Sequence, residues 1–305
     1  MWLVGQDAPC NGAAVASGST GAPDLVRYRS AVRDLVAQIG RDAGSDSHAA
    51  ERILASRLDH AAFAAVLAAS PRGYASTAAR LLMEIRGYQP GQGGAAMSLA
   101  AFTRISLLAQ IDAMWWGSSA GYQTDTDVLE SAELIDLDPL QEAGRLRFSY
   151  RHQAGSLLTR ATRSAERHTL PGRTPSTAGL QLARCRPQAV AWLNQLASEF
   201  AELAPPDTPP LWINSLTRSV KHQRHLRSLG YAALLPSSHC VGFAADIEIA
   251  WYRRFRAHRI LRGLLLEHQR ADEVNVIDEG QAWHVCLHPG IASGPRSVPR
   301  PRIGG

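Results

Sequence analysis

The chain has 305 residues, of which 45% are hydrophobic and 19% are charged, and its formal net charge is +5. This length and apolar content are enough for one large domain or two ordinary ones, which excludes a disordered chain. No apolar run approaches the roughly 18 to 20 residues that span a bilayer, so we expect no transmembrane segment. The apolar start MWLVG is shorter than the roughly 7 to 15 apolar residues of a secretory signal, so we expect no export signal in the chain as written.

The four cysteines are too few and too scattered for a disulfide scaffold, and no C-x-x-C pair indicates a thiolate zinc site. They are Cys10, Cys185, Cys240 and Cys286.

The first two thirds of the chain is predicted to be helical. Residues 1–22 are rich in Gly, Ala and Ser and are expected to form a flexible leader. Residues 23–204 are expected to form an all-α domain of unknown role, because apolar residues recur there at spacings of three and four. The segments with this pattern are 24–39, 51–69, 77–85, 101–116 and 189–203.

Charge is segregated within this helical part. Residues 125–142 hold seven acidic and no basic side chains, and residues 145–173 hold seven arginines and one acid. Either the arginine run forms a surface for a polyanion, or the two segments pack together and neutralise each other. Nucleic acid is not favoured as a partner, because no nucleic-acid-reading motif accompanies the charge.

The proline cluster at 204–210 is expected to be a linker, and residues 205–290 read as an α+β domain. Period-two patterns predict four strands, at 211–216, 242–249, 274–278 and 282–288. Helices are predicted at 219–230, with Ser219 as N-cap and Gly230 as its stop, and at 249–270. The basic, Gly- and Pro-rich residues 291–305 are expected to be a disordered tail.

The stretch PSSHCVGFAADIE at 236–248 contains two candidate metal ligands, His239 and Asp246. A catalytic zinc ion usually takes three protein ligands and keeps a fourth position open. His284, in the otherwise apolar last strand, is the expected third ligand. Taken singly, a histidine on a strand is more often a structural residue than a ligand. The combination favours a metal site, because Gly242 and Ala244 suit a loop that approaches one ion closely.

Together these residues form a recognisable pattern. S-x-H-x-x-G-x-A-x-D, filled by Ser237, His239, Gly242, Ala244 and Asp246 and followed by Trp283-His284, resembles the zinc D-Ala-D-Ala carboxypeptidases and dipeptidases. These enzymes share a fold with phage L-alanyl-D-glutamate endopeptidases and the hedgehog signalling domain. The resemblance covers 211–289 and implies a small antiparallel-sheet zinc peptidase domain behind the all-α domain. It implies one zinc ion per chain and a substrate that is a peptidoglycan stem peptide or a D-amino-acid dipeptide.

The resemblance also assigns roles to residues around the ligands. Arg218 would contact the substrate carbonyl or carboxylate and stabilise the oxyanion, although it could also be a surface ion-pair residue. Gln223 and Ser237 would orient the substrate or a ligand through hydrogen bonds, and Gln281 is a further candidate for such a contact. Peptidoglycan substrates place family members at the cell envelope or outside the cell, whereas the chain shows no signal, so its location stays open.

The sequence departs from the family at the general base. Family members usually carry a carboxylate three residues before the last histidine, where this chain has Gln281, and an amide cannot be a base. Glu279 is the expected replacement and Asp278 the alternative. If neither serves, the domain would be a catalytically weak or inactive zinc-stabilised binding domain for a cell-wall polymer or a protein partner.

Two further interpretations concern buried groups. Cys240 and Cys286 flank the proposed ligands and are either thiolate ligands, a redox pair or buried small hydrophobic residues. His258 is expected to be a core histidine within an apolar helix face. That face comprises Trp251, Tyr252, Phe255, Leu261 and Leu265.

Overall fold

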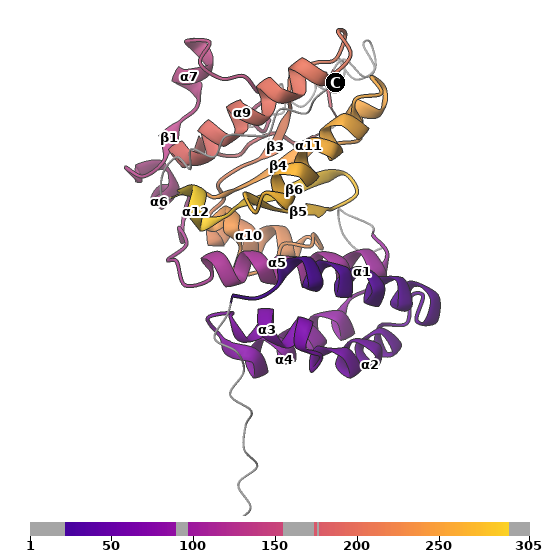
Figure 1. Cartoon of the computed structure of the whole chain (residues 1–305). Helices are drawn as coiled ribbons and strands as arrows, with labels where there is room; N and C mark the ends of the chain where they lie inside the picture. Colours follow the sequence, from indigo (N-terminus) through magenta and orange to yellow (C-terminus); the bar gives the residue numbers. More distant parts are fainter. Residues whose placement is uncertain (1–21, 90–96, 155–173, 176, 293–305) are drawn as a thin grey trace, which may run out of the picture.

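The computed structural model describes residues 22–89, 97–154, 174–175 and 177–292. The expected leader, apart from residue 22, and the tail from 293 onward lie outside these residues. None of the described helices is both long enough and apolar enough to cross a membrane. Two layers are visible in Figure 1, a helical layer from the first part of the chain and a mixed layer from the rest.

The helical layer comprises five helices with a common apolar core. Three of them begin at a polar cap, since Asp24, Asp46 and Ser98 each accept hydrogen bonds from backbone N–H groups of the following turn. The helices are α1 (Leu25–Asp42), α2 (Ser47–Leu58), α3 (Ala61–Ala68), α4 (Gly73–Gly87) and α5 (Leu99–Trp116). The prediction of a single helix over 51–69 was wrong, because His60 is extended and starts α3 as a separate helix.

Residues 125–203 are not wholly helical, which corrects the all-α prediction for 23–204. Ile135 and Asp136 pair with Cys185 and Arg184 in a two-stranded antiparallel sheet. Strands of two residues are too short to leave a periodic pattern in the sequence. The elements are α6 (Asp125–Glu130), β1 (Ile135–Asp136), α7 (Asp138–Glu142), β2 (Arg184–Cys185) and α9 (Pro187–Leu203).

The C-terminal part is built on a four-stranded antiparallel sheet of order β3-β4-β6-β5, so the expected α+β class with an antiparallel sheet is confirmed. Ser219 caps the following helix as predicted, accepting from the backbone N–H of His222. The strands are β3 (Ile213–Ser215), β4 (Ala244–Glu248), β5 (Val274–Asp278) and β6 (Ala282–Leu287). The helical segments are α10 (Val220–Ser228), η1 (Ser238–Val241), η2 (Trp251–Arg253), α11 (His258–Arg270) and α12 (Pro289–Ala292).

The predicted helix over 249–270 begins later than expected. Arg256 has a φ of 57°, a left-handed conformation that ends the helical path, and α11 starts at His258. His258 is therefore half-buried at a helix start and not inside the core. Trp251 and Leu261 are buried as predicted.

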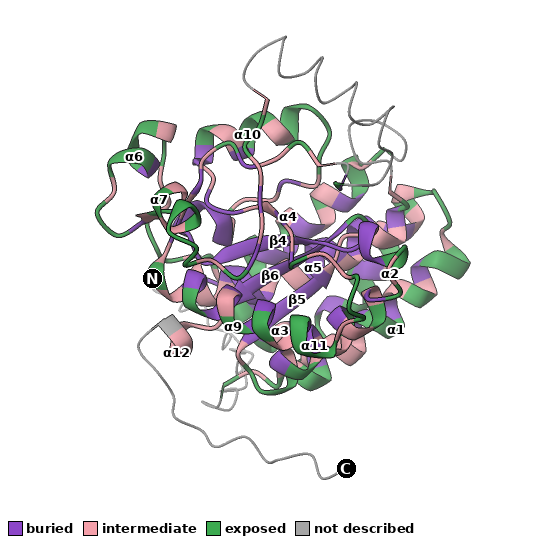
Figure 2. Ribbon diagram, turned by 90° about the horizontal axis from the view of Figure 1, so that it is seen from above, coloured by how far each residue is buried: buried purple, intermediate pink, exposed green. Residues whose placement is uncertain are grey.

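The sheet separates two different environments. Side chains of one face, such as Ile247 and Val285, share a core cluster with α9 and α11. The opposite face turns toward α5 of the helical layer, and Figure 1 shows the sheet between these helices. β4 and β6 are buried along their whole length and β5 is buried up to its last residue, as the view of Figure 2 shows. Both sheet faces are therefore covered, and polar groups on the α5 side must find partners there.

Helix α9 precedes the expected linker yet belongs to the core of the sheet. Phe200 and Leu196 lie in the same cluster as Ala245. The division between the two core clusters therefore does not coincide with the predicted boundary between 204 and 205. An amphipathic pattern predicts a helix but does not indicate which element its apolar face covers.

The segregated charges are only partly within the described residues. Arg160, Arg163, Arg167 and Arg173 of the arginine run lie outside them, so the polyanion surface stays a prediction. In the acidic segment, Glu133 forms an ion pair with Arg186, at 2.8 Å.

Candidate metal centre

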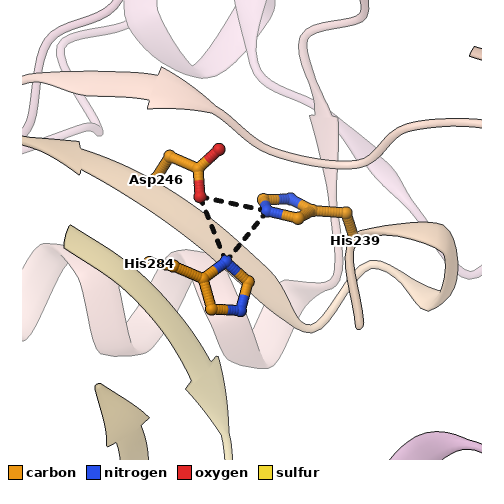
Figure 3. Close-up of side chains that lie close together, drawn as sticks. All are labelled: His239, Asp246 and His284. Carbon is orange, nitrogen blue, oxygen red and sulfur yellow. Dashed lines mark hydrogen bonds and ion pairs between the residues drawn. The ribbon is translucent and has the colours of Figure 1, made fainter. Parts of the chain in front are cut away.

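His239, Asp246 and His284 converge from three elements on one buried point, as Figure 3 shows. Nε2 of His239, Oδ1 of Asp246 and Nδ1 of His284 form a triangle with each side 3.1 Å long. On a tetrahedral zinc ion with bonds of about 2.1 Å, ligand atoms lie about 3.4 Å apart. The triangle is therefore close to the size that three zinc ligands require.

The local sequence explains why these side chains meet. Asp246 and His284 are direct partners in the antiparallel register of β4 and β6, so both project from the same sheet face. Gly242 ends η1 with a φ of 81°, and the chain reverses there so that His239 lies over β4. A Cβ at Gly242 would lie 2.9 Å from Leu134. The glycine of the motif is thus required by both backbone conformation and space.

The outer nitrogens of both histidines determine what the inner nitrogens can do. Nδ1 of His239 lies 2.7 Å from the backbone oxygen of Leu216, and Nε2 of His284 lies 2.8 Å from Oδ2 of Asp112. Because these oxygens accept hydrogen bonds, the outer nitrogens carry hydrogen and the inner nitrogens present lone pairs. Two lone pairs and a carboxylate oxygen therefore point at one another, an arrangement that needs a cation or a shared proton between them. The donor set and its orientation fit zinc.

The electrostatics of the three groups agree with this arrangement. Burial and the Arg218 guanidinium lower the pKa of His239. Burial opposes ionisation of Asp246, but His239 and Arg218 outweigh it and hold the pKa of Asp246 well below its usual value. Burial also lowers the pKa of His284, yet hydrogen bonds to Asp112 and Asp246 outweigh this and raise it well above its usual value. The additional proton of His284 would lie on Nδ1, the nitrogen that faces Asp246. A metal ion would compete with this proton for Nδ1.

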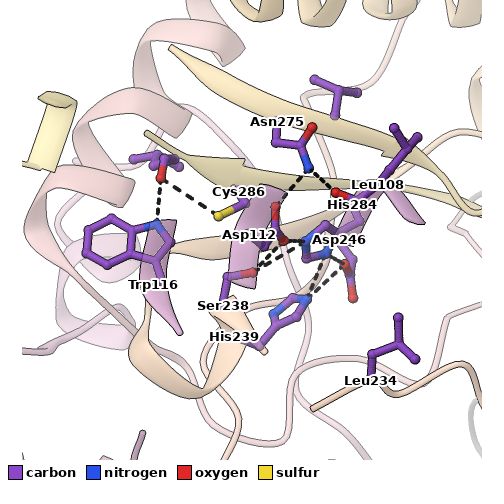
Figure 4. Close-up of polar contacts among 12 residues, drawn as sticks. Leu108, Asp112, Trp116, Leu234, Ser238, His239, Asp246, Asn275, His284 and Cys286 are labelled. Carbon is purple, nitrogen blue, oxygen red and sulfur yellow. Dashed lines mark hydrogen bonds and ion pairs between the residues drawn. The ribbon is translucent and has the colours of Figure 1, made fainter. Parts of the chain in front are cut away.

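Asp112 of α5 is a part of the centre that sequence reasoning missed. Its Oδ2 accepts hydrogen bonds from His284 and from Oγ of Ser238, the latter at 2.9 Å. Its Oδ1 accepts from Nδ2 of Asn275 at 2.8 Å, and Figure 4 shows this network. The available signal was a lone aspartate in the apolar helix segment AQIDAMWW, where a buried carboxylate needs partners. Ser238, and not the predicted Ser237, is the serine within the network.

Arg218 is bound directly to a ligand of the candidate centre. It forms an ion pair with Oδ2 of Asp246, and its Nη1 donates to Oε1 of Gln223 at 3.3 Å. Its Nε donates to Oγ of Ser215 at 2.7 Å. A guanidinium has five N–H donors, so these three contacts leave two for a bound molecule. Gln223 is in turn held by the backbone oxygen of Leu234, at 3.1 Å, and therefore positions Arg218.

A cleft of about 840 Å³ opens onto the three converging side chains. Its wall comes from both layers of the molecule, since Ile105 and Ala109 of α5 contribute to it. The predicted site residues that line it are Arg218, Gln223, Ser237, Glu279 and Gln281. The volume suits a short peptide or another small molecule.

The two candidate bases are placed differently by the turn between β5 and β6. Glu279 lines the cleft, and burial together with the Asp246 carboxylate raises its pKa to about 7. Asp278 does not line it, and its Oδ1 accepts the backbone N–H of Gly280 at 2.8 Å. Gln281 is exposed and also lines the cleft. Of the two acids, Glu279 is therefore the one available to a bound molecule.

The neighbouring cysteines are not among the converging groups. Cys240 and Cys286 are both buried free thiols. Burial raises the pKa of Cys240 to about 11, and it raises the pKa of Cys286 well above the usual value. Both groups are therefore thiols at neutral pH, which agrees with the interpretation as small hydrophobic residues.

Comparisons with known proteins identify no relative of this chain. No family model, no curated protein and no solved structure matches the chain. The class of site is therefore defined by its own geometry, a buried candidate metal centre of two histidines and one aspartate at the base of a cleft.

Proposed function

We propose that the chain is a zinc metallopeptidase that hydrolyses peptide bonds in cell-wall stem peptides or D-Ala-D-Ala-type peptides. The observation that carries this proposal is the triangle of three inward-facing acceptor atoms beside Arg218 at the base of the cleft. The motif that includes Ser237 and Gly242 supports the choice of peptide substrate, by resemblance. When bound, zinc supplies Lewis-acid chemistry, which polarises a carbonyl group and makes water more acidic.

The residues of the chain have distinct tasks in this proposal. The two remaining N–H groups of Arg218 donate to the substrate carbonyl oxygen and stabilise the negative charge that develops on it. Glu279 takes the proton from the attacking water on a carboxylate oxygen and delivers it to the leaving nitrogen. A pKa of about 7 suits both steps, because the group must accept and then release a proton near neutral pH.

The direct test combines metal analysis with a digestion assay. Purified protein is expected to retain one zinc ion per chain and to cleave D-Ala-D-Ala or a stem pentapeptide, with products identified by mass spectrometry. His239→Ala removes one ligand and is expected to abolish both properties, whereas His225→Ala changes an exposed histidine of α10 and should leave both intact. Folded, zinc-loaded protein that leaves both substrates whole would contradict the proposal.

One observation favours a second candidate function, that of a zinc-stabilised binding domain with little or no turnover. Gln281 occupies the position where the resembled family carries its base, so the chain relies on Glu279 from a different place in the turn. The discriminating variant is Glu279→Gln. An unchanged rate would exclude Glu279 as base, and zinc-dependent peptide binding without cleavage in either form would favour the binding role.

A further inference from the structure

A second carboxylate, that of Glu248, lies on the floor of the same cleft. Glu248 is only 6% exposed and lines the cleft, yet it is neither a candidate ligand nor a candidate base. It follows Asp246 by two positions on β4, so both side chains project from the same sheet face, about 7 Å apart along the strand. Its register partner on β6 is Ala282, whose small side chain leaves space above it.

The contacts of Glu248 use only part of what a carboxylate can accept. Oε1 accepts the backbone N–H of Trp251, and Oε2 accepts from Nδ2 of Asn214, both at 3.0 Å. Both donors are neutral, and none of the ion pairs among the described residues includes Glu248. An ionised carboxylate has about four acceptor positions, and a buried charge is costly unless a cation or several donors compensate it. Glu248 thus retains capacity for a positively charged donor.

Asn214 presents a second acceptor at the same place. Its Oδ1 is buried and has no hydrogen-bond partner within the described chain, although the residue lines the cleft. The orientation of this amide follows from its neighbour, because Nδ2 must face the acceptor oxygen of Glu248. A buried carbonyl oxygen without a hydrogen-bond partner is unfavourable, because it has lost its hydrogen bonds to water, and a bound donor would restore one of them.

We propose that Glu248 and Asn214 form a subsite for an ammonium group of the substrate. This inference rests on the proposed function, in which the scissile carbonyl lies beside Arg218 and Asp246. The subsite would then hold an ammonium about 7 Å from that carbonyl, two strand positions away. An ammonium has three N–H donors and one positive charge, which match two acceptors with free capacity and one buried negative charge. A metal ion is less well matched, because only one carboxylate is present.

The ammonium can come from the amino terminus of a short peptide or from a lysine-type side chain, and a binding experiment separates these sources. The first pair of probes is L-Ala-D-Ala-D-Ala with a free and with an acetylated amino terminus. The second pair is acetyl-L-Lys-D-Ala-D-Ala and its norleucine counterpart, which keeps the four side-chain carbons and lacks the ammonium group. Dissociation constants are measured by calorimetry on the zinc-loaded protein at low temperature, where cleavage is slow. Cleavage is followed in parallel.

At least one cationic probe is expected to bind 10-fold or more tightly than its neutral partner, and Glu248→Gln should remove that preference. Asn214→Ala, which leaves the carboxylate in place, should reduce the preference several-fold. Glu202→Gln on the exposed surface of α9 is the matched control and should preserve it. Thermal unfolding of each variant verifies that it is folded.

Equal binding within both pairs, or no binding of any probe, would overturn the subsite. A preference that persists in Glu248→Gln would also overturn it. The proposed function fails in a different way, since a cationic probe would then be bound with preference but never cleaved. The two results are therefore distinguishable.

Discussion

Asp112 accepts a hydrogen bond from Nε2 of His284 at 2.8 Å, although 172 positions separate the two residues in the sequence. The same carboxylate also binds Ser238 and Asn275, and Arg29 of α1 reaches Oδ1 of Asn275 at 3.3 Å. The helical layer, whose role the sequence left unknown, thus supplies a residue that orients a candidate metal ligand. Groups that orient histidine ligands commonly contribute to metal affinity.

The first prediction concerns this contact. Asp112→Asn removes the negative charge of the group that accepts the hydrogen bond from His284. It is expected to weaken zinc binding by about 10- to 100-fold, because the tautomer and ring orientation of His284 are no longer fixed. The measurement is a competition titration against a chelator of known affinity. Asp34→Asn, on the exposed side of α1, is the control and should not change the zinc affinity. Equal affinities of the Asp112→Asn variant and the wild type would show that this contact does not support a metal centre.

The second prediction tests the reversal at Gly242. In Gly242→Ala, the alanine would have to adopt a φ near 81°, and its methyl group would lie 2.9 Å from Leu134. The substitution should therefore destabilise the protein by about 1 to 3 kcal/mol and displace His239. Gly263→Ala in α11 is the matched control, since its Cβ meets nothing within 4 Å and alanine favours a helix by about 1 kcal/mol. Chemical denaturation gives the free energy of unfolding of both variants. A Gly242→Ala variant as stable as the wild type would refute the steric argument.

The third prediction separates the two candidate bases. Glu279→Gln should lower kcat by about 100-fold or more, whereas Asp278→Asn should change it only slightly. The rate of the wild type should fall on the acid side, because the base must be ionised. Its pKa is about 7, and a bound cation would lower it by attraction to the carboxylate, so the decline should lie below pH 7. Equal losses in the two variants would mean that Glu279 is not the base.

The fourth prediction concerns stability and lies away from the cleft. The imidazole of His268 is buried between α9 and α11 and contacts Glu199 at 2.8 Å as well as Glu273. Burial lowers the pKa of His268, but these two carboxylates outweigh it and raise the pKa above its usual value. A raised pKa contributes stability that is complete below the unfolded pKa of about 6.5 and is lost as the pH rises through the folded value.

The free energy of unfolding of metal-free protein should therefore decrease from pH 6 toward pH 9, and less steeply in His268→Gln. The comparison of the two proteins isolates His268 from His284, whose pKa is also raised. His225→Gln serves as the exposed control and should keep the wild-type slope. Parallel slopes in the wild type and His268→Gln would contradict the prediction.

Much of the local structure is determined by the sequence alone, because periodicity and capping act over neighbouring residues. The apolar spacing in 24–39 and 101–116 predicted α1 and α5, and period-two patterns predicted the strands that carry Asp246 and His284. The motif also indicated that His239, Asp246 and His284 meet, and the structure brings them together. Local pattern was misleading where one residue changes the path of the chain, as at Arg256, and where two-residue strands interrupt the part that was expected to be all-α.

Only the tertiary structure decided which distant groups complete the site. The apolar spacing in the sequence predicts the helix that contains Asp112, but not the element against which that helix packs. Asp112 contacts His284 because α5 packs on the sheet face that bears His284. The sequence already favoured Glu279 over Asp278 as the candidate base, and the structure adds that Glu279 lines the cleft whereas Asp278 does not. Glu248 becomes a candidate subsite only because strand pairing sets it beside Asp246 on the floor of the cleft. Such contacts depend on which faces of helices and strands pack together, and the periodicity of a single segment does not indicate its packing partner.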